Sequence, residues 1–194
     1  MHRMSLASDD QSLAVPDAEI LDACLAALAA GESAALETLY KHTSAPIYGF
    51  ALSILKNAPD AEDVLHDCYV NVYAAAPRYT SGGKPMAWML TIARNLCLQK
   101  LREGRKTADL PQEDWEKYLE AREGMTAEDR LLVAECLTKL TDEERQIVVL
   151  HAVAGFKHRE TAELLGLPLP TVLSKYNRAL KKLKALLWKG EPKS

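Results

Sequence analysis

The segment from Gly155 to Lys184 constrains the fold of this chain more than any other. Apolar residues recur at helical spacing on both sides of Gly166, which predicts two short amphipathic helices joined by a tight turn. Gly166 suits the left-handed conformation that ends a helix, and Pro170 fits a first helical turn, where its missing N–H costs little. The segment is therefore predicted to be a helix-turn-helix, whose second helix can enter a DNA major groove.

The distribution of charge supports an anionic ligand for this segment. The chain of 194 residues has a formal net charge of −3. Residues 145–194 nevertheless carry 10 Lys and Arg against 3 Asp and Glu, whereas residues 103–144 carry 6 against 13. A basic helical pair in an acidic chain indicates a surface for duplex DNA. The pattern by itself is also compatible with a purely structural helical hairpin.

The rest of the chain predicts an all-α fold of two small helical domains. Helical spacing of apolar residues covers 17–30, 32–55, 60–73, 86–101, 126–137 and 142–153, and no strand alternation is long enough to compete with it. Pro46 is expected to bend or break the second of these helices. Thr141 and Glu144 form a capping box for the helix over 142–153. Residues 107–125 are acidic and are predicted to be a linker with one helical turn around Trp115.

Several functional classes are not supported. The four cysteines lie far apart among apolar residues, so they are expected to be free core residues in a reducing compartment, with no metal site. No apolar run approaches the ~20 residues of a membrane span and no signal peptide opens the chain, so a soluble cytoplasmic protein is expected. His42, His66, His151 and His158 lack a recognisable catalytic partner in the sequence, and no phosphate-binding glycine motif is present. We therefore expect no catalytic residues, no cofactor and no enzymatic activity.

Three stretches together resemble a known family. They are DAEDVLHDCYVNVY at 60–73, KPMAWMLTIARNLCLQKLREGRK at 84–106 and LTDEERQIVVLHAVAGFKHRETAELLGLPLPTVLSKYNRALKKLK at 140–184. In this order they resemble the extracytoplasmic-function (ECF) sigma factors of bacterial RNA polymerase, over residues 30–187. Residues 1–16 are polar and are expected to be a flexible N-terminus. The resemblance implies sigma region 2 at 17–106, the acidic linker at 107–125 and sigma region 4 at 126–189. It also implies binding to core RNA polymerase and promoter DNA, promoter-specific transcription initiation, and in many members an anti-sigma partner.

The resemblance implies two sites in the first domain. Asp63, His66 and Asp67 correspond to the polar helix face that docks on the polymerase clamp helices, although a solvated face is the alternative. The loop at 78–85 corresponds to the segment that captures a flipped base of the melted minus-ten element. A glycine-containing loop flanked by cations suits single-stranded DNA. The residues expected to contact this strand are Arg78, Lys84, Trp88, Arg94, Asn95, Gln99 and Arg102, with Trp88 also interpretable as a core residue.

The second domain carries the expected minus-thirty-five reader. Leu173, Ser174, Asn177 and Arg178 match the base-reading positions of the family, and Asn and Arg suit adenine and guanine edges. Four further residues fit phosphate contacts, which position a protein without reading sequence: Thr171, Lys175, Lys181 and Lys182. Leu173 and Leu180 stand where the family often has basic residues, so we expect weak DNA binding without polymerase. The linker at 107–124 matches the segment that threads the polymerase RNA path.

One other function is compatible with the sequence. A DNA-binding regulator could use the C-terminal helix-turn-helix alone, with the first domain serving as an effector or dimerisation module. Such a protein should give symmetric footprints on duplex DNA without polymerase, whereas a sigma factor should bind free duplex poorly and asymmetrically.

Overall fold

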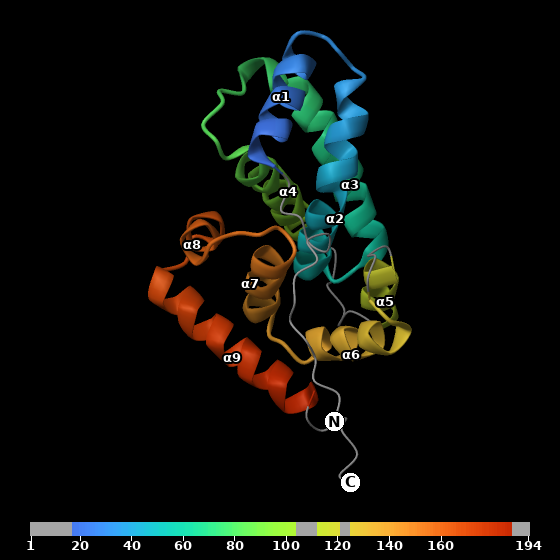
Figure 1. The fold of residues 1–194 in the computed structure, drawn as a ribbon, viewed down its shortest axis with the longest axis vertical. Coiled ribbons are helices and arrows are strands. Elements are labelled where there is room, and N and C mark those ends of the chain that lie inside the picture. The colour runs from blue at the N-terminus through green and yellow to red at the C-terminus, as the bar shows by residue number, and fades with distance from the viewer. Residues whose placement is uncertain (1–16, 104–111, 121–124, 188–194) are drawn as a thin grey trace, which may run out of the picture.

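Helices form all the regular structure in the described residues, which are 17–103, 112–120 and 125–187 of the computed structural model (Figure 1). The predicted all-α fold is confirmed over these residues. The flexible N-terminus expected at 1–16, parts of the linker and residues 188–189 lie outside them. The elements are α1 (Ala18–Ala29), α2 (Ala35–Leu55), α3 (Ala58–Ala75), the 3-10 turn η1 (Ala76–Arg78), α4 (Pro85–Arg102), α5 (Gln112–Glu120), α6 (Ala127–Thr138), α7 (Asp142–Ala152), α8 (His158–Leu165) and α9 (Leu169–Leu187).

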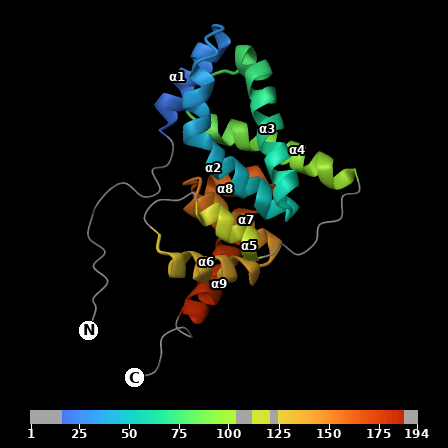
Figure 2. The same ribbon diagram turned by 90° about the vertical axis from the view of Figure 1, so that its right-hand side faces the viewer.

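Helices α1–α4 make up the upper part of the molecule, and α5–α9 make up the lower part (Figures 1 and 2). The upper core is formed where α2 packs against α1, α3 and α4, and it contains Phe50, Val64, Met89 and Leu90. Cys24, Cys68, Cys97 and Cys136 are all free and buried, as expected. Burial raises the pKa of the Cys68 and Cys97 thiols to about 12. These thiols are therefore unreactive core residues.

Helix α2 continues through Pro46 as one element, so the expected break does not occur. An interior proline removes one backbone hydrogen bond and costs about 3 kcal/mol or more. Pro46 is buried, and α2 contacts α1, α3, α4 and also α7 of the lower part. We infer that this packing offsets the local cost of the proline.

The middle of the linker is more structured than the sequence indicated. Residues 112–120 form the full helix α5, in which Trp115 is completely buried and Tyr118 and Leu119 are nearly so. Helix α5 packs against α6. The Tyr118 hydroxyl donates to the Ala45 carbonyl of α2 at 3.2 Å, and a side chain at Gly49 would collide with the Tyr118 ring. The linker helix is thus docked on the upper domain.

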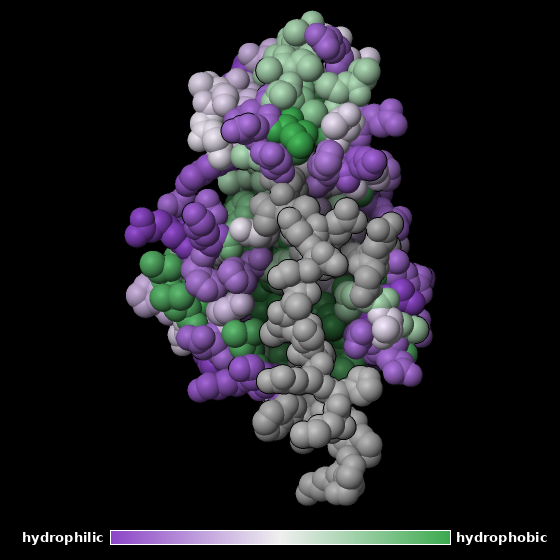
Figure 3. All heavy atoms as spheres, viewed as in Figure 1, coloured by the Kyte–Doolittle hydropathy of each residue, from purple (hydrophilic) through white to green (hydrophobic). Residues whose placement is uncertain are grey.

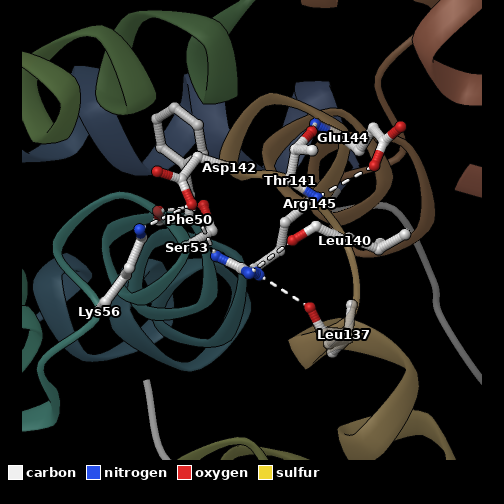
Figure 4. A network of polar contacts seen from close by, with 9 residues as sticks. All are labelled: Phe50, Ser53, Lys56, Leu137, Leu140, Thr141, Asp142, Glu144 and Arg145. Carbon is white, nitrogen blue, oxygen red and sulfur yellow. Dashed lines mark hydrogen bonds and ion pairs between the residues drawn. The ribbon is translucent and has the colours of Figure 1, made fainter. Parts of the chain in front are cut away.

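The two parts also meet where α7 packs against α2 (Figure 4). Lys56, which caps α2 in a left-handed conformation, pairs with Asp142 at 2.8 Å. Arg145 pairs with the same carboxylate at 3.2 Å and donates to the carbonyls of Leu137 and Leu140 at 2.9 and 2.8 Å. Because these carbonyls lie at and just beyond the end of α6, Arg145 joins α6 to α7. The predicted capping box of Thr141 and Glu144 is confirmed at the start of α7.

Candidate nucleic-acid interface

The helix-turn-helix has the geometry that its sequence predicts. Gly166 adopts a left-handed conformation with φ of 69° at the end of α8, and the Leu167 N–H donates back to the Ala162 carbonyl at 3.0 Å. Pro170 lies in the first turn of α9. Ala162, Leu165, Val172 and Ala179 are buried between the helices. The turn therefore fixes the orientation of α9 through an apolar core and a glycine C-cap.

The outer face of α9 carries the exposed part of the predicted minus-thirty-five reader. Ser174, Asn177, Arg178 and Lys181 are exposed at helical spacing on one face. Leu173 is 39% exposed, whereas Thr171 is half-buried. Figure 3 shows hydrophilic residues mixed with apolar ones along the lower left edge, where α9 runs in Figure 1. This face offers hydrogen-bonding groups and two cations, interrupted by a leucine.

Two of the predicted phosphate contacts are engaged inside the domain. Lys175 pairs with Glu143, and the Lys182 ammonium contacts Glu144 at 2.6 Å. Glu144 is only 2% exposed. Burial alone would raise its pKa, but hydrogen bonds from Lys182 and Thr141 hold the pKa below its ordinary value. Both lysines hold α9 on α7 through these ion pairs.

Three aromatic rings join α7, α8 and α9 inside the helix-turn-helix domain. The rings of His151 and His158 stack with centroids 4.7 Å apart, and Tyr176 lies 4.8 and 4.6 Å from them. His151 Nδ1 lies 2.8 Å from the Phe156 carbonyl. Burial, together with the neighbouring His151, lowers the pKa of His158. This cluster positions the three helices, and it gives His151 and His158 a structural role in packing.

The predicted base-capturing loop forms one wall of a pocket. The pocket has a volume of about 400 Å³, within the range of about 300–1,000 Å³ typical of small-molecule sites. Tyr79 packs on Trp88 with ring centroids 4.7 Å apart, so Trp88 serves both the core and the pocket wall. The lining residues from the upper part are Arg78, Tyr79, Thr80, Gly82, Lys84, Ala87, Trp88 and Thr91. The structure therefore brings three predicted minus-ten residues together around one cavity.

Helix α8 closes the other side of this pocket. Glu160, Glu163 and Leu164 of α8 line it, and Lys84 pairs with Glu163 at 3.6 Å. Arg94 of α4 is half-buried and donates to the Leu165 carbonyl at the end of α8, at 3.4 Å. The part of the predicted minus-ten surface around Lys84 and Arg94 is consequently in contact with the helix-turn-helix in this arrangement.

The other predicted minus-ten residues lie further along α4. Asn95 is exposed and shares a second pocket, of about 290 Å³, with Arg78. Gln99 and Arg102 are exposed near the end of α4, where the Gln99 amide donates to Glu103 at 3.1 Å. These residues extend from the first pocket along one helix and do not form a single compact cluster.

Helix α3 presents the predicted polymerase-binding residues to solvent. Asp63, His66 and Asp67 are all exposed. Lys100 of α4 contacts Asp63 at 2.9 Å and Asp60 at 3.6 Å, which fixes the start of α3 on α4. Val70, one turn beyond His66 and Asp67, is 68% exposed. The face is therefore polar with an apolar residue at its end.

Sequence comparison assigns the two parts of the chain to one family. The model of Sigma-70 region 2 matches residues 39–107, and that of Sigma-70 region 4 matches residues 130–183. The ECF RNA polymerase sigma factor EcfG of Rhodopseudomonas palustris is 31% identical over 142 residues, which cover 72% of this chain and 77% of that protein. The chain belongs to the ECF sigma factor family. The ECF sigma factor SigK of Mycobacterium ulcerans is 29% identical and aligns over 86% of this chain and 93% of its own length.

Solved structures agree with this assignment. CnrH, solved in complex with the cytosolic domain of CnrY, matches with a TM-score of 0.61 and 26% identity, over 89% of this chain and 99% of that one. The sigma factor RpoE of Bartonella quintana, solved with the anti-sigma factor NepR, has a TM-score of 0.60 at 23% identity, over 80% and 98% of the two chains. The latter likeness concerns the fold alone.

As an ECF sigma factor, the protein binds core RNA polymerase and promoter DNA and directs promoter-specific transcription initiation. It is an initiation factor without enzymatic activity of its own. Within residues 17–103, 112–120 and 125–187, no helix combines the length and the apolar character that crossing a membrane requires.

The structure adds residues to the pocket region that sequence reasoning did not name. Thr80 and Thr91 line the pocket, and Asp22 of α1 contacts the loop at two points. Glu160 and Glu163 close the pocket from the other domain. Only the loop residues had a signal in the sequence, because they lie inside the segment at 78–85. Asp22 and the α8 acids reach the pocket through tertiary packing alone.

Proposed function

We propose that this sigma factor captures a flipped base of a melted minus-ten element against the side of the pocket that the loop at 79–84 and α4 form, once α8 has left its other side. The observation that supports this proposal is the combination of an aromatic wall, Tyr79 on Trp88, with Arg78 and Lys84 at the same cavity. Aromatic faces stack on unpaired bases, and cations follow the backbone of a single strand. Asn95, Gln99 and Arg102 would then extend the path of the strand along α4, joined by Arg94 once it leaves Leu165.

The minus-thirty-five element is proposed to bind the outer face of α9. Ser174, Asn177 and Arg178 would read base edges in the major groove, and Lys181 would contact a phosphate. Thr171 and Leu173 border this face. Lys175 and Lys182 are paired with Glu143 and Glu144, which partly neutralise their charge, so their phosphate contacts are expected to be weak.

Core polymerase is proposed to dock on α3 through Asp63, His66 and Asp67. This proposal is supported by the exposure of all three side chains on α3. The ion pair between Lys100 of α4 and Asp63 fixes α3 in place. Mixed polar groups at the rim of an interface mainly set orientation and association rate, while an exposed apolar residue such as Val70 adds buried area.

Promoter binding is proposed to require separation of the two parts seen in contact here. Elements named minus-ten and minus-thirty-five lie about 25 base pairs apart, which is about 85 Å along B-DNA at about 3.4 Å per base pair. Helix α9, with its 19 residues, is only about 28 Å long. Arg94 contacts the end of α8 and α8 lines the pocket, so the two readers lie side by side in the compact arrangement, and we expect them to be too close together to reach both elements at once.

An anti-sigma partner that stabilises the compact arrangement is also proposed. The sigma factor RpoE of Bartonella quintana was solved in complex with the anti-sigma factor NepR, which supports the idea for this chain by likeness. We further propose that the protein acts in the cytoplasm, where core polymerase and DNA are present, and that its linker threads the polymerase RNA path after α5 leaves α2.

Transcript sequencing with purified components tests these proposals together. Core polymerase plus the full chain should start transcription at a defined set of genomic promoters that share two upstream motifs. Substitution of Asp63, His66 and Asp67 by alanine should abolish co-purification with core polymerase. Symmetric footprints on duplex DNA without polymerase, and no specific transcripts with it, would instead support a stand-alone DNA-binding regulator.

A further inference from the structure

The loop at 79–84 is held by a residue from a helix far away in the chain. The Tyr79 hydroxyl donates to one carboxylate oxygen of Asp22 at 2.6 Å, and the Ser81 hydroxyl donates to the other at 2.7 Å. Asp22 belongs to α1, which lies outside the residues that match the region 2 family model. Both oxygens of a single carboxylate are thus used on two loop residues that flank Thr80.

The Asp22 hydrogen bonds restrain a loop whose two glycines give its backbone unusual freedom. Gly82 and Gly83 of the loop lack a side chain, so the loop backbone has little intrinsic preference for one conformation. Gly83 adopts a φ of 70°, in the left-handed region. Ordering such a segment costs conformational entropy. Hydrogen bonds to an ionised acceptor are stronger than neutral ones and favour one loop conformation before DNA arrives.

The same contact sets the geometry of the pocket wall. Tyr79 is anchored at its hydroxyl by Asp22 and at its ring by Trp88, 4.7 Å away between centroids. Thr80, between the two anchored residues, is exposed and lines the pocket. The position of the aromatic wall and of Thr80 therefore depends on a carboxylate that does not itself line the pocket.

We propose that Asp22 is a positioning residue for minus-ten recognition, because its carboxylate holds Tyr79 and Ser81 so that the loop presents its side of the base pocket in a fixed geometry. The inference rests on the proposed role of this loop in base capture. Asp22 touches no DNA and acts through the two loop residues.

The test uses holoenzyme assembled from core polymerase and the full chain. Two DNA probes are compared: a fork whose minus-ten strand is single-stranded, and a duplex that carries only the upstream element. Asp22→Ala should weaken binding to the fork about tenfold, since both hydrogen bonds that hold the loop are lost. It should leave binding to the upstream duplex and to core polymerase unchanged.

Conservative variants separate positioning from simple loss of stability. Asp22→Asn should bind the fork within about twofold of the wild type, because its amide can accept from Tyr79 and donate to Ser81. Glu19→Ala, which removes an exposed carboxylate from the same helix, is the matched control and should have no effect. Ser81→Ala should cause a smaller loss than Asp22→Ala, and the double variant should be no weaker than Asp22→Ala alone.

Three results would overturn the inference while leaving the proposed function intact. They are wild-type fork binding by Asp22→Ala, equal losses on the fork and the upstream duplex, and an Asp22→Asn variant as weak as Asp22→Ala. A wild-type holoenzyme that binds a fork with a scrambled minus-ten strand equally well would overturn both the proposed base capture and this inference.

Discussion

Lys56 at the end of α2 and Asp142 at the start of α7 form a 2.8 Å ion pair between region 2 and region 4. The Lys56 side chain is 15% exposed and that of Asp142 is 53% exposed, so solvent partly screens the pair. Asp142 is simultaneously held by Arg145. The two regions are thus joined by a contact that is specific in geometry but modest in energy.

Removing the Lys56–Asp142 ion pair should favour separation of region 2 from region 4. Lys56→Ala is expected to cost about 0–1 kcal/mol in the free energy of unfolding, because the cores of both regions stay intact. The radius of gyration from small-angle scattering should increase, since fewer contacts hold the regions together. Lys41→Ala, an exposed lysine on the same helix, is the control. An unchanged scattering profile in Lys56→Ala would show that the apolar contact between α2 and α7 is sufficient to hold the compact arrangement.

Substitutions at Gly49 and Tyr118 should have strongly non-additive effects on the free energy of unfolding. An alanine at Gly49 would collide with the Tyr118 ring, so Gly49→Ala should lower the melting temperature in the wild-type background. In a Tyr118→Ala background the collision is absent, and the same change should stabilise the helix by about 0.5–1 kcal/mol. Additive effects of the two substitutions in a double-mutant cycle would contradict the docking of α5 on α2.

The stability of region 4 should fall in mild acid. His158 has a lowered pKa in the folded protein, so the unfolded chain binds more protons below the ordinary value of 6.5. The corresponding stabilisation is complete above that value and is lost as the pH falls below it toward the folded pKa. Thermal melting between pH 7 and pH 5 should therefore show a decline that is smaller in His158→Gln.

His42→Gln, which changes an exposed histidine of α2, is the control for this measurement. Glu144 also has a lowered pKa, but from an ordinary value of 4.5, so its contribution is lost only at more acidic pH. A pH profile of His158→Gln identical to that of the wild type would exclude the ring cluster as the cause of the decline.

Arg178 and Lys181 should have different effects on promoter binding by the holoenzyme. Arg178→Ala should relax base preference at one position of the upstream element at a cost of about 1–3 kcal/mol. Lys181→Ala should weaken binding to all sequences alike and reduce the salt dependence of the logarithm of the binding constant by about one unit. Titrations at several salt concentrations with matched and mutated upstream duplexes distinguish these outcomes. Equal effects of Arg178→Ala on all sequences would make it a phosphate contact.

Much of this architecture follows from local sequence. The helix-turn-helix was predictable because Gly166, Pro170 and the apolar spacing each favour the same local geometry, and the capping box of Thr141 and Glu144 is equally local. Of the bend or break expected at Pro46, the break does not occur, since the propensity of one residue is outweighed by packing on several sides of α2. The linker helix was underestimated, although Trp115, Tyr118 and Leu119 have the spacing of one buried face.

The sequence by itself determined the two domains, the family and the faces of α3 and α9 that carry the exposed polar groups. Tertiary structure alone decided that Asp22 holds the loop at 79–84, that Lys182 is engaged by buried Glu144 and that α8 covers the pocket. The physical reason is the separation along the sequence of the residues that interact. Helix periodicity, caps and turns depend on neighbours within a few residues, whereas these contacts join residues 38 or more positions apart and depend on how whole helices pack.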